Sequence, residues 1–348
     1  MATVDVTVKG AGIFGLSIAW ACVLRGARVQ VVDPGGVAAG ASGGIVGALA
    51  PHVPENWNLK KAFQLESLLM AGPFWAGVEA VSGLSSGYGR TGRLQPLADA
   101  AALELARART ETAAELWGDH AIWEVVRTGG VGWAPHSPTG YFIRDTLSAR
   151  IHPRRACESL AAALALRECP VVAEADEAGH VVHATGWQGL EVISEAFGGA
   201  VGTGVKGQAV LLRHAAPVDA PQLFVDSLHI VPHADGTVAI GSTTEREFDA
   251  PGTVDAAADE LVERAVEQVP ILHGAAIAGR WAGVRPRARS RAPMLGCWPG
   301  RPGHFIANGG FKIGFGMAPK VAEIMADLVL EGRDVIPEAF GVAANLPS

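Results

Sequence analysis

The sequence predicts an α/β fold in which a parallel βαβ domain is interleaved with an antiparallel-sheet domain carrying helices. Three segments carry this prediction. The first 33 residues have the pattern strand, glycine-rich turn, helix and strand. Residues 208–240 contain three short apolar strands, and the last two meet at Asp235-Gly236, a dipeptide typical of hairpins. The chain then returns to a glycine-rich loop and a final helix, expected at 319–330 between Pro319 and Gly332.

The individual elements follow from apolar spacing. Alternation predicts strands at 4–8 and 27–32, and helical spacing between them predicts a helix at 13–24. Further helices are expected at 59–81, 99–117, 153–166 and 255–269, and further strands at 181–184, 208–212, 228–231 and 237–240. The length of 348 residues agrees with about two domains. We predict that 1–80, 140–205 and 280–348 form the first domain, and that 81–139 and 206–279 form the second.

Composition excludes several classes of protein. Only 18% of residues are charged and 49% are hydrophobic, which excludes a disordered chain. A net charge of −7 without a basic run argues against nucleic acid as a partner. No apolar stretch reaches the roughly 20 residues of a membrane span. Four dispersed cysteines and scattered histidines predict reduced thiols and no metal site. We therefore expect a cytoplasmic protein.

A dinucleotide fingerprint stands in the first βαβ unit. It consists of Gly10, Ala11, Gly12, Ile13, Phe14 and Gly15, the pattern G-x-G-x-x-G. Gly10 makes the tight turn, Gly12 lets the backbone approach a pyrophosphate, and Gly15 permits close helix–strand packing. Asp33 ends the next strand, 18 residues after Gly15, and can accept hydrogen bonds from a ribose diol. The pattern predicts a Rossmann-type domain that binds NAD or FAD.

Four further segments bear on that choice. They are 41–51, rich in small residues; 182–187, which ends in Thr185, Gly186 and Trp187; 230–243, around the hairpin; and 281–319, which contains Trp281-Ala-Gly283-Val-Arg285-Pro286 and Asn308-Gly-Gly310-Phe311-Lys312. In this order they resemble the D-amino acid oxidase superfamily of FAD enzymes, with glycine oxidase and D-amino acid dehydrogenase as the nearest types. The resemblance implies non-covalently bound FAD, and makes the first domain FAD-binding and the second substrate-binding.

The resemblance also implies which residues contact FAD. Within the fingerprint these are Gly10, Gly12, Ile13, Phe14 and Gly15, with Asp33 at the ribose. Beside the flavin ring it implies Ala41, Ser42, Gly43, Gly44, Gly47, Ala48 and Leu49. The segments that return to the cofactor would supply Val172 near the adenine, then Ala184, Thr185, Gly186, Trp187 and Gly283. The loop over the flavin would supply Gly310, Phe311, Lys312, Ile313, Gly314, Phe315 and Gly316. The final helix would point its N-terminus, at 317–320, toward the flavin.

Three residues are expected at the substrate. The resemblance assigns Arg285 to the substrate carboxylate, a task that suits a guanidinium fork because it binds both oxygens. Lys312 falls where glycine oxidases carry a second arginine, and His229 falls where they carry a tyrosine. Arg285, Arg287, Arg289 and Arg291 alternate, so in an extended strand they would share one face. That series fits either a more acidic or larger substrate or a solvated basic strand.

The implied reaction is oxidation of the Cα–N bond of glycine, a D-amino acid or an N-methyl amino acid to an imino acid, by hydride transfer to flavin N5. Oxygen or a quinone would accept the electrons. Two alternatives remain: an NAD-dependent Rossmann dehydrogenase and a flavoprotein that oxidises another secondary amine. The sequence leaves the oligomeric state open.

Overall fold

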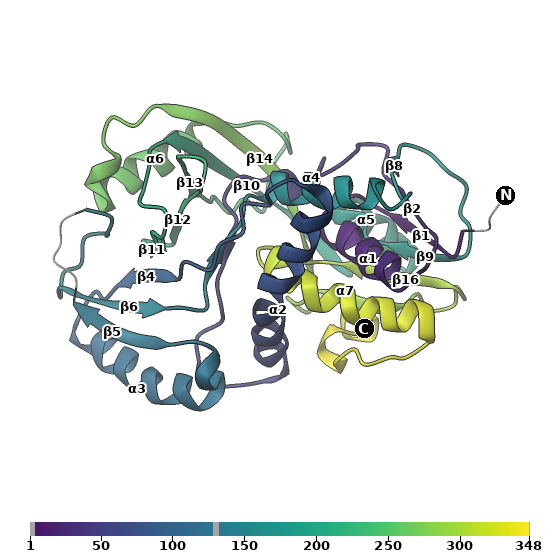
Figure 1. Cartoon of the computed structure of the whole chain (residues 1–348), viewed down its shortest axis with the longest axis horizontal. Coiled ribbons are helices and arrows are strands. Elements are labelled where there is room, and N and C mark those ends of the chain that lie inside the picture. The colour runs from purple at the N-terminus through teal and green to yellow at the C-terminus, as the bar shows by residue number, and fades with distance from the viewer. Residues whose placement is uncertain (1–3, 128–131, 348) are drawn as a thin grey trace.

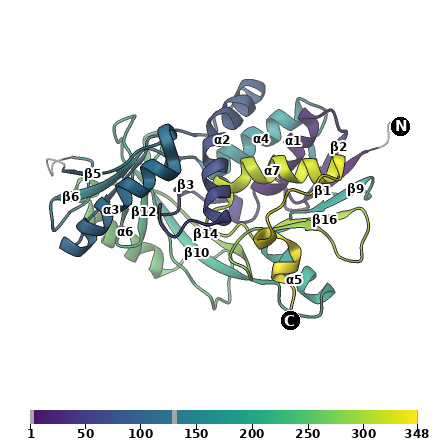
Figure 2. The same cartoon turned by 90° about the horizontal axis from the view of Figure 1, so that it is seen from below.

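The computed structural model describes residues 4–127 and 132–347, and it contains two large sheets that lie end to end (Figure 1). A six-stranded sheet forms one half of the molecule, and an eight-stranded sheet forms the other. Helix α2 (Leu59–Ser82) stands between the halves, as Figures 1 and 2 both show. The predicted α/β fold with a parallel and an antiparallel part is confirmed.

The six-stranded sheet has the order β15-β16-β9-β1-β2-β8. Its strands are β1 (Val6–Lys9), β2 (Val29–Val32), β8 (Val171–Val172), β9 (His180–His183), β15 (Met294–Cys297) and β16 (His304–Asn308). All neighbours are parallel except β15 and β16. Because the carboxyl ends of β1, β2 and β9 meet at one edge, the loops that follow them converge there.

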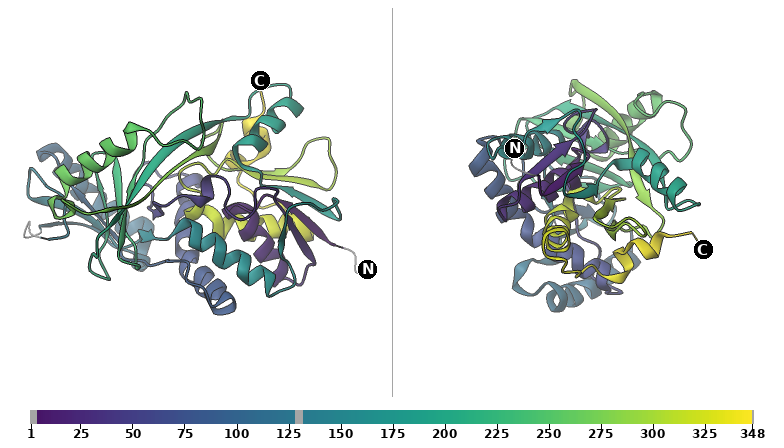
Figure 3. Two further views of the ribbon diagram at one scale, coloured as in Figure 1. Left: turned by 90° about the horizontal axis from the view of Figure 1, so that it is seen from above. Right: turned by 90° about the vertical axis from the view of Figure 1, so that its right-hand side faces the viewer.

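Helices cover the parallel sheet. Helices α1 (Ile13–Leu24), α2, α4 (Pro153–Ala165) and α7 (Gly314–Glu331) bury their apolar sides in one core with it. Helix α5 (Gly186–Ala196) packs in a separate cluster with β14 (Ile277–Ala288), β15 and β16. The small pair β3 (Ala48–Leu49) and β7 (Ala149–Arg150) contacts the second half, because Gln222 donates to the carbonyls of Leu49 and Ala149. Figure 3 shows this arrangement from above and from the end.

The eight-stranded sheet has the order β14-β10-β13-β12-β11-β4-β6-β5. Its strands are β4 (Arg93–Pro96), β5 (Trp123–Arg127), β6 (Tyr141–Asp145), β10 (Gly202–Arg213), β11 (Gln222–Val225), β12 (Leu228–Pro232), β13 (Thr237–Gly241) and β14 (Ile277–Ala288). Helix α6 (Ala256–Gln268) covers β10 to β13, and α3 (Ala100–Trp117) packs on β5 through the rings of Trp117 and Trp123. No helix within 4–127 and 132–347 is long and apolar enough to cross a membrane.

The final helix begins earlier than the sequence indicates. We expected its N-terminus at 317–320, but α7 begins at Gly314 and contains Pro319. Two glycines in its first turn lower helix propensity, which is why the pattern misplaced the start. The turn is nevertheless closed by the amide of Met317, which donates to the carbonyl of Ile313 at 3.0 Å.

The predicted domain boundaries remain predictions. The structure adds one fact that bears on them: β6 (Tyr141–Asp145) pairs in the eight-stranded sheet, although we assigned 140–205 to the first domain. Strands β10 and β14 pair along nearly their whole length and reach from one half of the molecule to the other (Figure 2).

Candidate active site

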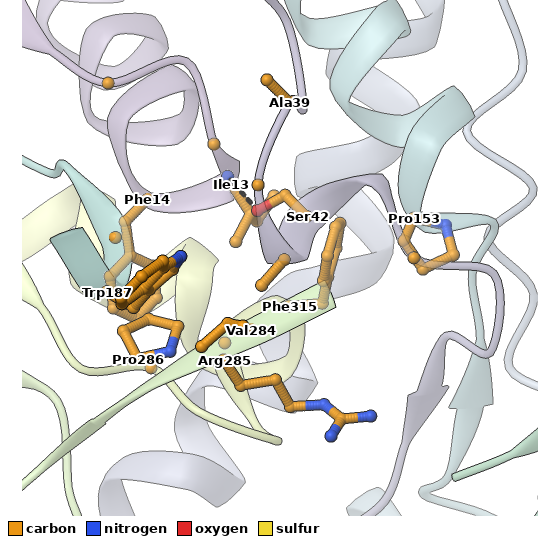
Figure 4. A pocket seen from close by; sticks show the side chains of 18 of the residues that line it. Ile13, Phe14, Ala39, Ser42, Pro153, Trp187, Val284, Arg285, Pro286 and Phe315 are labelled. Atoms are coloured by element: carbon orange, nitrogen blue, oxygen red, sulfur yellow. Dashed lines mark hydrogen bonds between the residues drawn. The ribbon is translucent and has the colours of Figure 1, made fainter. Parts of the chain in front are cut away.

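A cavity of about 1110 Å³ lies where the two halves meet. Its wall includes the loops after β1, β2 and β9, the segment 39–48, strand β14 and the start of α7. Ligand pockets commonly have volumes of about 300–1,000 Å³. This cavity therefore has room for a large ligand that reaches from the parallel sheet to the antiparallel one. Figure 4 shows part of its wall, with Trp187 and Pro286 close together and Arg285 extending away from them.

The fingerprint turn is built as the sequence predicts. Gly10 has a φ of +109°, and a Cβ there would lie 2.3 Å from the carbonyl oxygen of Ala184. Gly12 precedes the first turn of α1 and has no side chain to cap it. The amide of Ile13 donates to Ser42 Oγ at 2.9 Å, the bond drawn in Figure 4. An open helix N-terminus at a cavity wall attracts an anion through its amides and its dipole.

Asp33 completes this end of the cavity. One carboxylate oxygen accepts the amide of Ala11 at 2.7 Å, and the other accepts the amide of Gly35 at 2.9 Å. These bonds fix the carboxylate on the cavity wall. Each carboxylate oxygen can accept more than one hydrogen bond, so Asp33 retains acceptor capacity for a ligand hydroxyl.

The structure brings most of the predicted cofactor residues to one surface. Those that line the cavity are Gly10, Gly12, Ile13, Phe14, Asp33, Ala41, Ser42, Gly44, Gly47, Ala48, Ala184, Thr185, Gly186, Trp187, Gly310, Phe311, Lys312, Gly314, Phe315 and Gly316. Their contact with a cofactor remains a prediction, but their position is the one it requires.

Other predicted residues lie beside the cavity: Gly15, Gly43, Leu49, Val172, Gly283 and Ile313. A Cβ on Gly15 would lie 1.9 Å from the carbonyl oxygen of Gly10, so this glycine serves packing, and a Cβ on Gly43 would meet the carbonyl oxygen of Ala38 at 2.4 Å. The indole of Trp281 covers Gly283 and lines the cavity in its place.

The other three lie close by for different reasons. Val172 ends β8, and the residues that line the cavity are the next ones, 173–175. Leu49 and Ile313 line a smaller cavity of about 110 Å³, whose wall shares His229 and Lys312 with the large one.

Several residues that line the large cavity were not predicted from the sequence. Phe224 and Ser227, around the turn between β11 and β12, reach the cavity from the antiparallel sheet, as do Val284 and Pro286 from β14. Pro286 stood in a motif quoted from the sequence. No sequence signal marked Phe224, because the register that brings β11 to this edge depends on long-range pairing.

Arg285 is held at the wall with 9% of its surface exposed. Its Nη1 donates to the carbonyl oxygen of Thr243 at 3.4 Å, and its Cζ lies 6.0 Å from the Trp281 ring centre. The guanidinium occupies space that Gly207 leaves open, since a Cβ there would lie 1.9 Å from Nη1. Burial lowers the pKa of Arg285 to about 10, partly opposed by the negative charge of Glu245, so the side chain stays charged at neutral pH.

Lys312 and His229 share this end of the cavity. Lys312 Nζ donates to Thr244 Oγ1 at 2.9 Å, and burial followed by the positive charge of Arg285 lowers the lysine pKa. His229 is partly buried, and its Nδ1 has no hydrogen-bond partner among the described residues. Burial, with the charges of Arg93 and Lys312, lowers the pKa of His229 to about 4, so the ring is neutral at pH 7. The structure therefore brings all three predicted substrate residues together.

Comparison with known proteins identifies the family. Residues 5–328 match the profile of the family described as FAD dependent oxidoreductase, abbreviated DAO. The chain belongs to this family. It is 25% identical, over an alignment of 375 positions, to a glycine oxidase from Geobacillus kaustophilus (strain HTA426), covering 93% of this chain and 92% of that one.

Solved structures show the same fold. The glycine oxidase from Geobacillus kaustophilus superimposes with a TM-score of 0.84 at 20% identity, covering 97% of this chain and 98% of that one. Iminodiacetate oxidase (IdaA) from Chelativorans sp. BNC1 superimposes with a TM-score of 0.82 at 20% identity, with the same coverage. The predicted superfamily, FAD as cofactor and the class of amino acid oxidase or dehydrogenase are thereby confirmed, and the NAD alternative is wrong.

The cavity fits FAD on structural grounds. At one end, beside the N-terminus of α1, Gly12 has no side chain. A Cβ there would lie 3.1 Å from Ser42 Oγ and would narrow the space open to a ligand. Asp33 would hold the ribose and this helix N-terminus the pyrophosphate. Gly314 to Gly316 line the other part of the cavity at the start of α7, so a second helix N-terminus would face the flavin.

Proposed function

We propose that this FAD-dependent enzyme oxidises the Cα–N bond of a small amino acid, whether glycine, a D-amino acid or an N-methyl amino acid. The imino acid formed would hydrolyse to an oxo acid. One observation carries the proposal. Arg285 presents a buried guanidinium to the cavity, and no carboxylate of a described residue pairs with it.

A buried cation without an ionic partner is costly, and a substrate carboxylate would satisfy it. The planar fork would bind both carboxylate oxygens and so fix the orientation of the adjoining Cα. FAD, when bound, supplies the two-electron acceptor. The contribution of the protein is then positioning, which brings Cα to the cofactor in a reactive geometry.

The neighbouring groups support the same geometry. The His229 ring lines the cavity in its neutral form, so it adds no charge beside the substrate, and its buried Nδ1 has no hydrogen-bond partner among the described residues. The alternating arginines that begin with Arg285 do not all face the cavity. Arg285 lines the cavity. Arg287 lies over the Phe311 ring, with its Cζ 5.8 Å from the ring centre, and Arg289 donates to the carbonyl of Leu346 at 2.8 Å.

Flavin absorbance after anaerobic mixing tests the proposal. Glycine, sarcosine and D-alanine, compared with matched amines that lack a carboxylate, should include amino acids that bleach the flavin bands. Arg285→Met should raise the half-saturating amino acid concentration by about tenfold to a hundredfold. Arg289→Met, which changes an exposed arginine outside the cavity, is the matched control. Bleaching by the amines but by no amino acid would instead favour oxidation of another secondary amine.

The electron acceptor follows from a second readout. If oxygen reoxidises the bleached flavin and peroxide accumulates with turnover, the enzyme is an oxidase. If reoxidation needs an added quinone, it is a dehydrogenase.

A further inference from the structure

Two cationic side chains at the substrate end of the cavity are held by consecutive residues. Arg285 donates to the carbonyl of Thr243, and Lys312 donates to the hydroxyl of Thr244 at 2.9 Å. Neighbouring Cα atoms are about 3.8 Å apart, so one short segment anchors both positive groups. Both partners are neutral, and neither cation forms an ion pair with a carboxylate within residues 4–127 and 132–347.

The acids that line the cavity lie elsewhere. Asp33 follows β2 and Glu174 follows β8, so both belong to the end where the fingerprint turn lies. At the substrate end the remaining titratable side chain on the wall is His229, whose pKa of about 4 keeps it neutral. The wall there carries two positive charges and no negative one among the described residues.

A second layer of charge lies behind this wall. Lys206 is 4% exposed, and its Nζ lies 3.2 Å from Glu245 Oε2 and 3.7 Å from Asp255 Oδ2. Gln208 Nε2 donates to both acids, at 3.1 and 2.9 Å. This layer has one negative charge in excess, and Glu245 favours the charged form of Arg285. The two layers together keep one unbalanced positive charge, the charge of Lys312.

We propose that the substrate carries a second anionic group, which Lys312 binds while Arg285 binds the α-carboxylate. An amino acid with one carboxylate is a neutral zwitterion and leaves Lys312, an exposed residue on the cavity wall, without an ionic partner. An amino dicarboxylic acid neutralises it. The inference rests on the proposed function and names its substrate class: amino dicarboxylic acids and their N-substituted analogues, in preference to glycine or alanine.

The first test needs no turnover. Succinate and butyrate have the same number of carbons but differ by one carboxylate, and binding of each to the oxidised holoenzyme is measured from the change in flavin absorbance. Succinate should bind at least about tenfold more tightly. In Lys312→Met the ratio of the affinity for succinate to the affinity for butyrate should fall toward one, and in Lys312→Arg the preference for succinate should return. Lys60→Met, a lysine outside the cavity that donates to the carbonyl of Ser290, is the matched control.

Two results would overturn the inference. One is equal affinity of the unchanged enzyme for succinate and butyrate. The other is a loss in Lys312→Met that is the same for both ligands, since Lys312 would then act on the flavin or on the fold and not on a second carboxylate.

Turnover separates this inference from the function on which it rests. Aspartate and asparagine, each as both enantiomers, have nearly the same shape and differ in one charge. Faster anaerobic flavin reduction by an enantiomer of aspartate supports the second anion site. Equal reduction by both amino acids overturns that site and leaves the proposed function standing. Reduction by no amino acid refutes the proposed function, and the substrate class falls with it.

Discussion

Replacing Gly207 by alanine should disable the Arg285 clamp without changing Arg285 itself. Gly207 lies on β10 beside the strand that carries the arginine. A Cβ there would lie 1.9 Å from Nη1, 2.3 Å from Nη2 and 2.4 Å from Cζ of Arg285. The backbone of Gly207 is not in the left-handed region, so it accepts alanine, and the flexible guanidinium is the group that must move.

The size of the effect follows from the bond that is lost. A hydrogen bond to a charged group contributes about 1.5–3 kcal/mol, which is about a tenfold to hundredfold change in affinity for a carboxylate. The fold should tolerate the change, because alanine lowers the conformational entropy of the unfolded chain, and this offsets part of the cost of moving the guanidinium. We expect the free energy of unfolding to change by about 1 kcal/mol or less.

The assay compares Gly207→Ala with Gly279→Ala. A Cβ at Gly279, on the neighbouring β14, would meet nothing within 4 Å. Anaerobic titration of flavin reduction with amino acid should show weakened saturation in Gly207→Ala alone, with normal flavin content in both variants. If Gly207→Ala binds carboxylates as tightly as the unchanged enzyme, Arg285 does not hold the substrate where the structure places it.

Three further predictions concern the cofactor and the response to pH. Asp33→Ala removes the acceptor of two loop amides and of the ribose, so FAD affinity in a fluorescence titration of the apoprotein should fall about tenfold or more; unchanged affinity would refute the ribose assignment. Gly10→Ala forces a Cβ toward a carbonyl oxygen at 2.3 Å with φ at +109°, so it should purify with little or no flavin, and full flavin content would contradict the fingerprint geometry. Burial lowers the pKa of His152 from 6.5 to about 4, so between these pH values the unfolded chain protonates His152 and the folded chain does not. The free energy of unfolding should therefore be greatest above pH 6.5 and fall as the pH drops toward 4. His152→Gln should reduce that fall by about 2 kcal/mol in urea unfolding at pH 7 and 4.5, and parallel curves for the two proteins would exclude the histidine as a cause.

The first βαβ unit was predictable because every local signal in it agrees. Helix α1 (Ile13–Leu24) has the expected bounds, since a glycine turn precedes it and Arg25-Gly26 follows. The fingerprint glycines also took the expected positions, because their chemistry depends on the backbone of one short segment. No contact with a distant part of the chain is needed to specify this unit.

The long strands of the second half were not predictable in the same way. Strand β14 contains Gly279, Gly283 and Pro286, residues that weaken an isolated strand pattern. It is stabilised by pairing with β10 along nearly its whole length, a contact between segments about 75 residues apart. The same long-range register brings Phe224 to the cavity, which no local pattern could show.

The substrate residues were located by resemblance, and their environment came from the fold. The sequence placed Arg285 and Lys312 in the site, but their anchoring by Thr243 and Thr244 depends on where the segment after β13 passes. The charge balance between the wall and the layer around Lys206 is likewise a tertiary property.

The most direct test of the account is the visible absorption spectrum of the purified protein before and after anaerobic addition of amino acids. We expect oxidised-flavin bands that bleach with at least one amino acid, and most readily with one that carries two carboxylates. Flavin bands that persist with glycine, sarcosine, alanine and both enantiomers of aspartate would contradict oxidation of a small amino acid at this site.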